Sequence, residues 1–268
     1  MADSVSLPAQ KPRRRRLRGA RTIFALILRE MATTYGRSAV GYMWAIIEPV
    51  AALTLLTLVF SLLLRSPPLG SNFPLFYASG YLIFSAYISV TNKVATSVQF
   101  SRQLLEFPAV TVLDAILARF ILNMLTQIMV ICIVLTGIIV IYDLKLILDL
   151  KDILISLGMT AAFVLGLGTF NCYLFLAFPS YQQVWSIANR PMFILSCIFF
   201  LFDSVPQPYR DFLWYNPLIH MVGKMRAGIY ATYQAEYVSI AYVMGLSLLL
   251  FAVGLFLLRH HVRNALNA

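Results

Sequence analysis

The chain has 268 residues, of which 60% are hydrophobic and 12% are charged, and its formal net charge is +10. Soluble domains carry about 25% charged residues, so this composition excludes a water-soluble globule. It predicts an all-α integral membrane protein that crosses the bilayer several times.

The N-terminus is polar and rich in arginine over residues 1–19. We expect a disordered cytoplasmic arm attracted to anionic lipid headgroups, and not a nucleic-acid-binding segment, because no aromatic residues interleave with the basic ones. Residues 20–36 predict an amphipathic interface helix, since their apolar residues recur at helical spacing. A helix packed on a soluble partner is the alternative.

Residues 37–268 are predicted to form one transmembrane domain with six spans, each near the ~20 residues that a bilayer core requires. The predicted spans are residues 42–64, 73–98, 113–141, 153–178, 184–202 and 237–258. With the N-terminus inside, 15 of the 21 Lys and Arg residues fall on the inner side. The positive-inside rule therefore predicts that both termini are cytoplasmic.

Two connecting segments have unusual composition. Residues 101–110, SRQLLEFPAV, predict a short cytoplasmic helix on the membrane surface, which is either a docking element or an ordinary loop. Residues 206–230 predict two short helices that break near Asn216-Pro217. Neither is long enough to span, so we interpret them as re-entrant helices on the periplasmic side, with a capping loop as the alternative.

The segment Tyr35–Pro49, YGRSAVGYMWAIIEP, joins the interface helix to the first span. Its glycine spacing imitates the start of a P-loop, but the phosphate-binding lysine is missing, so we predict no nucleotide hydrolysis in this chain. A glutamate at membrane depth is costly, so we expect Glu48 to face the bundle interior or a dimer seam and not lipid.

Enzymatic chemistry finds little support. The three histidines and three cysteines form no zinc-binding pattern, and no G-x-S-x-G motif is present. We predict no catalytic residue, no metal site and no cofactor. A Ser–His–Asp arrangement stays open. An integral-membrane glycosyl- or acyltransferase is the alternative function, and it would need acid and base residues gathered at one membrane face, which the lone histidines and scattered acids argue against.

Two helical stripes suggest close contacts. One is aromatic and is predicted to line a substrate channel, where flat rings suit sugars; it consists of Phe73, Tyr77, Tyr81 and Phe84. A lipid-facing belt is the alternative. The other stripe, Gly158, Ala162 and Gly166, predicts tight helix packing within one bundle.

These features together resemble the ABC-2 transporter permeases, most closely the capsular polysaccharide and O-antigen exporters of the KpsM and Wzm type. The resemblance is carried by YGRSAVGYMWAIIEP, the six spans, SRQLLEFPAV and the NPL sequence at residues 216–218. It covers residues 18–263.

The resemblance implies a permease that forms a homodimeric channel in the bacterial inner membrane for a lipid-linked polysaccharide. Two cytosolic ABC ATPase subunits would bind ATP and Mg. A periplasmic co-polysaccharide protein and an outer-membrane exporter would continue the path. Export of a small molecule or a lipid is the alternative.

The resemblance also implies roles for particular residues. The ATPase-coupling set is Arg102, Leu104, Leu105, Glu106 and Phe107. The periplasmic gate set is Trp214, Asn216, Pro217 and Arg226. The residues expected to meet the lipid linker at the cytoplasmic mouth are Arg21, Arg29, Arg37, Tyr42 and Glu48.

Overall fold

The computed structural model describes residues 15–34, 40–105 and 110–266, in which every regular element is a helix. The long helices are α1 (Arg15–Thr34), α2 (Val40–Leu63), α3 (Phe73–Ala95), α6 (Val112–Ile141), α7 (Leu150–Ala177) and α11 (Ile240–Leu266). The shorter ones are α4 (Ser97–Phe100), α5 (Arg102–Leu105), α8 (Tyr181–Leu195), η1 (Phe202–Ser204), α9 (Tyr209–Trp214) and α10 (Pro217–Ile229).

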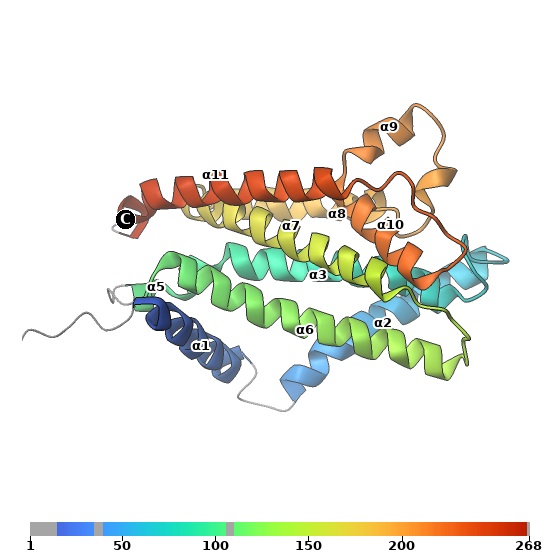
Figure 1. The fold of residues 1–268 in the computed structure, drawn as a ribbon, viewed down its shortest axis with the longest axis horizontal. Helices are drawn as coiled ribbons and strands as arrows, with labels where there is room; N and C mark the ends of the chain where they lie inside the picture. Colours follow the sequence, from blue (N-terminus) through green and yellow to red (C-terminus); the bar gives the residue numbers. More distant parts are fainter. Residues whose placement is uncertain (1–14, 35–39, 106–109, 267–268) are drawn as a thin grey trace, which may run out of the picture.

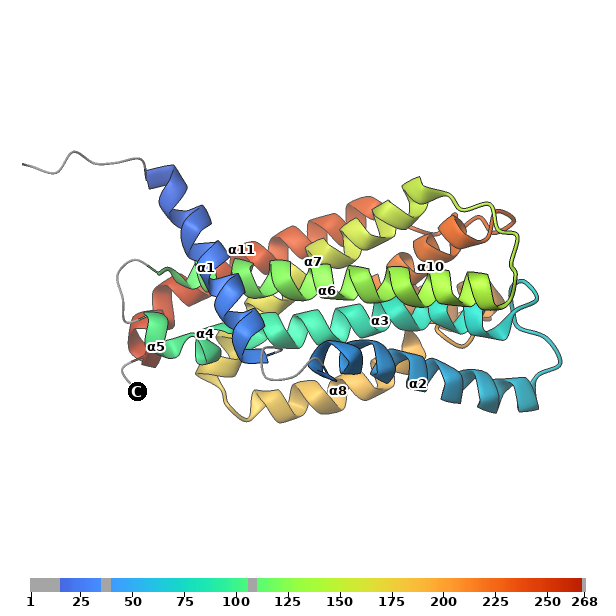
Figure 2. The ribbon, with the colours of Figure 1, turned by 90° about the horizontal axis from the view of Figure 1, so that it is seen from below.

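The long helices other than α1 run side by side along the long axis of the molecule (Figure 1). At the centre of the bundle, α7 packs against α3, α10 and α11, and α3 packs against α6 on its other side. The peripheral helix α2 contacts mainly α3. Outside the bundle, α1 crosses α6 near the end where α5 and the end of α11 also lie (Figures 1 and 2).

Glycines set the close approach of α7 and α11. A Cβ atom on Gly166 of α7 would collide with the Ser247 carbonyl of α11. On the facing helix, a Cβ on Gly254 would lie 2.7 Å from the Phe170 nitrogen. Tight packing is therefore confirmed at Gly166, whereas Gly158 at the other end of the predicted stripe faces open space.

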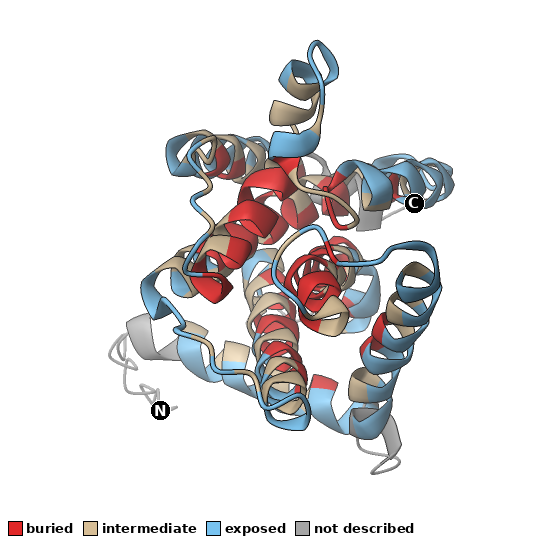
Figure 3. Ribbon diagram, turned by 90° about the vertical axis from the view of Figure 1, so that its right-hand side faces the viewer, coloured by how far each residue is buried: buried red, intermediate tan, exposed pale blue. Residues whose placement is uncertain are grey.

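Buried residues lie on the inward faces of the helices, and the outer faces are exposed (Figure 3). Many of the exposed side chains are large and apolar, for example Leu62 of α2 and Phe256 of α11. Such a surface suits acyl chains and not water. Five helices within the described residues are long and apolar enough to cross a membrane, over 43–63, 73–95, 112–141, 150–177 and 240–260.

The predicted fifth span differs most from the structure. The helix α8 ends at Leu195, and irregular chain follows to Leu201, so this helix is shorter than the predicted 184–202 segment. The ending has a physical cause. Cys197 has a left-handed φ of 56°, and the carbonyls of Ile198 and Phe200 accept hydrogen bonds from a distant arginine, Arg226, instead of a helical N–H.

Other element boundaries also differ from the predicted ones. The helix α1 begins at Arg15, inside the stretch expected to be a disordered arm. In the predicted coupling segment, α5 covers only Arg102–Leu105, and residues 106–109 lie outside the described part. Between α8 and α11 the two short helices are α9 and α10, with the break at Tyr215–Asn216.

Candidate functional site

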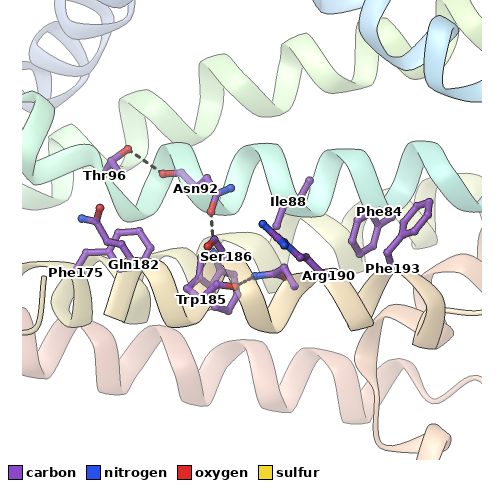
Figure 4. Close-up of a pocket in the computed structure, with 11 residues that line it drawn as sticks. Phe84, Ile88, Asn92, Thr96, Phe175, Gln182, Trp185, Ser186, Arg190 and Phe193 are labelled. Carbon is purple, nitrogen blue, oxygen red and sulfur yellow. Dashed lines mark hydrogen bonds between the residues drawn. The ribbon is translucent and has the colours of Figure 1, made fainter. Parts of the chain in front are cut away.

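A groove of about 630 Å³ lies between α3 and α8 (Figure 4). It is lined by Phe84, Ile88, Asn92, Thr96, Phe175, Gln182, Trp185, Ser186, Asn189, Arg190 and Phe193. Aromatic rings stand toward both ends, and amide, hydroxyl and guanidinium groups lie between them. This mixture of ring faces and polar groups is typical of a binding site for a polar molecule with apolar faces.

The two helices that form the groove run in opposite directions. At the start of α8, the Gln182 amide lies 3.5 Å from Gln99 of α4, which follows α3. Near the end of α8, the Phe193 ring lies 5.1 Å from the ring of Phe84, which comes earlier on α3. The groove therefore follows the length of α8.

A chain of hydrogen bonds fixes the polar wall. The Trp185 indole N–H donates to Asn92 Oδ1 over 2.8 Å, which ties α8 to α3. The Asn189 amide donates to the Trp185 carbonyl and accepts from the Tyr87 hydroxyl, each over 2.8 Å. These side chains are therefore held in place before any ligand arrives.

Arg190 stands apart from this network. It is the only charged residue in the lining, and its side chain is exposed. Among the described residues, no hydrogen bond or ion pair is made by the Arg190 side chain. From the sequence, Arg190 counts among the inner positive charges and, with Asn189 and Pro191, interrupts the predicted fifth span, but no binding role is predicted for it.

The predicted aromatic stripe on α3 does share one face, but much of it is covered within the single chain. Tyr77 has no exposed surface and packs 5.2 Å from the ring of Phe60 on α2. Near the other end of the stripe, Phe84 lies 5.1 Å from Phe193 and reaches the groove. Tyr81, 6.2 Å from Phe193, and Phe73 are half-buried.

The residues predicted to meet the lipid linker do not form one cluster. Arg21 is exposed, and the Arg29 guanidinium lies 5.6 Å from the ring centre of Phe100. Glu48 is exposed on the single chain, so the bundle interior does not enclose it. Arg37 and the side chain of Tyr42 lie outside the described part.

A buried ionic cluster lies next to the coupling segment, and sequence reasoning missed it. Arg119 Nε lies 2.9 Å from Glu30 Oε1, which joins α6 to α1. The same guanidinium donates to Thr96 Oγ1 over 3.1 Å and covers the ring of Phe100 at 4.4 Å. Beyond the cluster, Arg102 is exposed.

The rest of the predicted coupling set is only partly visible. Leu104 and Leu105 are half-buried. Glu106 and Phe107 lie outside the described residues.

The predicted gate residues hold the region between α8 and α11 together. Asn216 caps α10 by accepting the Leu218 N–H, and Pro217 is the first residue of that helix. Trp214 donates to the Tyr237 carbonyl over 3.0 Å. Fully buried Arg226 donates to the carbonyls that follow α8, so it fastens the fold from inside.

His220 on α10 completes this region. Its Nδ1 atom accepts the Ser239 N–H over 3.2 Å, and its other ring nitrogen therefore donates to the Trp214 carbonyl over 2.8 Å. Acceptance at Nδ1 requires the neutral ring with its proton on Nε2. Burial also lowers the pKa of His220. Within the described residues, no group of three or more His, Cys, Asp or Glu side chains is placed to bind a metal.

Comparison with known proteins gives a consistent result. Residues 21–230 match the family model described as ABC-2 type transporter. The chain is 29% identical to the polysialic acid transport protein KpsM of Escherichia coli, over 89% of this chain and 92% of the relative. It is 26% identical to the capsule polysaccharide export inner-membrane protein CtrC of Neisseria meningitidis serogroup A, over 88% and 89%.

A third relative, the capsule polysaccharide export inner-membrane protein BexB of Haemophilus influenzae, is 24% identical over 90% of this chain and 91% of its own length. The resemblance drawn from the sequence motifs is confirmed. Since the family model covers most of the residues, this chain belongs to the ABC-2 type transporter family.

Proposed function

We propose that this chain is the permease subunit of an ATP-driven exporter that carries a capsular polysaccharide across the bacterial inner membrane. The observation that carries the proposal is the groove between α3 and α8, whose lining combines aromatic rings with amide, hydroxyl and guanidinium groups. Aromatic faces suit the C–H faces of sugars, and amides suit their hydroxyls. The names of the relatives support the same cargo.

The proposed permease crosses the membrane six times, with α8 and residues 196–201 as the fifth crossing. The end of α10 meets the start of α7, because Asp149 N–H donates to the Gly228 carbonyl over 2.8 Å. The start of α8 follows the opposite end of α7. The chain must therefore return along the bundle through α8. Short α9 and α10 then act as re-entrant helices, and the positive-inside rule puts both termini in the cytoplasm.

A second copy is proposed to close the groove. The helices α2 and α8 flank α3 on the same side of the bundle (Figure 2). Both expose large apolar side chains there, including Leu55 and Ile187. Exposed Glu48 lies on α2, and a carboxylate is too costly to leave in hydrocarbon. A homodimer seam on this side accounts for both observations.

Energy is proposed to come from two cytosolic ATPase subunits that bind ATP and Mg, with α5 as part of the docking surface. In this proposal α1 lies along the membrane interface, and the predicted linker-binding arginines face the cytoplasmic leaflet. A periplasmic co-polysaccharide protein and an outer-membrane exporter then receive the polymer.

Docking of the ATPase can be tested by matched charge reversals. Arg102→Glu alters the exposed surface of α5, whereas Lys145→Glu alters an exposed loop at the opposite end. We expect Arg102→Glu to reduce co-purification of the ATPase at least ~10-fold, about 1.4 kcal/mol, and Lys145→Glu to leave it unchanged. Equal binding by both variants would contradict the docking role.

The cargo can be tested by deleting the gene. Surface polysaccharide should disappear while polymer accumulates inside the cell, and the wild-type gene should restore export. Intact surface polysaccharide together with altered drug tolerance would instead indicate a small-molecule exporter.

A further inference from the structure

We infer that Arg190 selects the cargo by charge, so that the groove takes a glycan with carboxylates on its sugar units. The inference rests on the proposed function and adds the chemical class of the polymer. It also assigns the discrimination to one side chain.

The first argument is the absence of a counter-charge. The groove lining contains one cation and no acidic residue. On the same helix, Trp185 and Asn189 are occupied by their own hydrogen bonds. Across the groove, Asn92 accepts from Trp185, and Thr96 donates to the Asn92 carbonyl. The Arg190 guanidinium is the one charged donor in the lining, and it keeps its donors for a ligand.

The helix α2 lies on the same side of α3 as α8 (Figure 2) and carries one acidic residue, Glu48. Within the described residues that carboxylate makes no ion pair with Arg190. A cation without a partner is costly in the proposed fifth crossing, and such residues mark substrate paths. Arg190 is therefore placed where an anion from outside the chain completes the site.

The second argument concerns the source of that anion. In Figure 4, Arg190 lies between Trp185 on one side and Phe84 and Phe193 on the other. A group that reaches Arg190 is thus flanked by flat ring faces, which suit sugar units on both sides. The planar guanidinium binds a carboxylate through two parallel hydrogen bonds. Because a guanidinium binds a phosphate in the same two-pronged way, it is the rings on both sides of Arg190, which suit sugar units, that favour a charge carried by the sugars over a phosphate at the lipid end.

The test uses the purified full-length chain in lipid nanodiscs and fluorescently labelled oligosialic acid. The matched neutral probe is the same oligomer with its carboxyls reduced to alcohols, and short-chain phosphatidic acid supplies the lipid-phosphate arm. Binding is measured by fluorescence anisotropy and by competition. We expect the wild-type chain to bind the acidic oligomer at least ~10-fold more tightly than the reduced one, with the preference falling as salt rises.

Three variants locate the effect. Arg190→Gln should bind both oligomers equally, within about two-fold, because the charge is gone. Arg190→Lys keeps the charge but loses the planar pair of N–H donors, so it should retain part of the preference for the acidic oligomer. Arg65→Gln, at an exposed position before α3, should behave as wild type. Elution profile and melting temperature check that each variant is folded.

The inference is overturned if Arg190→Gln keeps the acidic preference, if the wild-type chain does not discriminate, or if only phosphatidic acid competes. These failures are distinct from failure of the proposed function. Loss of surface polysaccharide on gene deletion would still support export when Arg190 proves indifferent to charge.

Discussion

The buried ion pair between Glu30 and Arg119 fastens α1 to α6, and its loss is expected to release α1. The two side chains expose only 4% and 7% of their surface, and their charged atoms are 2.9 Å apart. Breaking a buried pair costs about 3–5 kcal/mol, because the remaining charge is left without a partner. Since about 1.4 kcal/mol is tenfold in an equilibrium, Glu30→Leu should raise the detached fraction of α1 by roughly 100-fold or more.

Hydrogen exchange of the α1 amides, measured by mass spectrometry on the full chain in nanodiscs, reports this detachment. Glu30→Leu should accelerate α1 exchange, while Glu236→Leu, at an exposed glutamate, should not. The double variant Glu30→Leu with Arg119→Met removes both charges and should recover most of the protection. Wild-type exchange rates in Glu30→Leu, or a double variant that exchanges as fast as the single one, would refute this reasoning.

Three further predictions concern the packing of the fold and are measured as melting temperatures in nanodiscs. Gly166→Ala should destabilise the chain by about 1–3 kcal/mol through overpacking against α11, whereas Gly158→Ala, which faces open space, should be tolerated; equal effects would contradict the assigned helix contact. Arg226→Met should lower the free energy of unfolding by about 1–3 kcal/mol for each backbone carbonyl left unpaired. The control Lys224→Met, which removes the partly exposed ion pair with Asp152, should cost much less. A similar loss of stability in both variants would argue against the role of Arg226 inside the fold. The pKa of His220 is lowered from its ordinary 6.5, so its neutral form stabilises the fold above pH 6.5, and this stability is lost as pH falls through the lowered value. In His220→Gln the melting temperature should no longer fall at acid pH for this reason. An unchanged pH profile of the melting temperature in His220→Gln would contradict the role of this histidine.

Much of the fold follows from local signals. Length and hydropathy locate the long helices because hydrocarbon demands about 20 apolar residues per crossing. Helix starts follow from short-range caps, as where Asn72 accepts the Leu75 N–H before α3 and Thr111 forms a capping box with Asp114 before α6.

The parts that could not be predicted depend on contacts between distant residues. The helix α8 ends early because Arg226 binds carbonyls that lie 26 and 28 residues before it. The partner of Arg119 is Glu30, 89 residues away, and no local pattern indicates that pairing. The same limit applies to the groove. Asn92 and Trp185 are 93 residues apart, and only the packing of α8 on α3 brings them together.

Transport by reconstituted protein tests the central claim most directly. The full chain and its partner ATPase are placed in proteoliposomes, and a labelled lipid-linked acidic polysaccharide is added on the ATPase side. The account predicts that the polymer becomes protected inside the vesicles only when ATP and Mg are present, and that transport requires both proteins. Movement of the polymer without ATP, or ATP hydrolysis that never moves it, would contradict an ATP-driven polysaccharide permease.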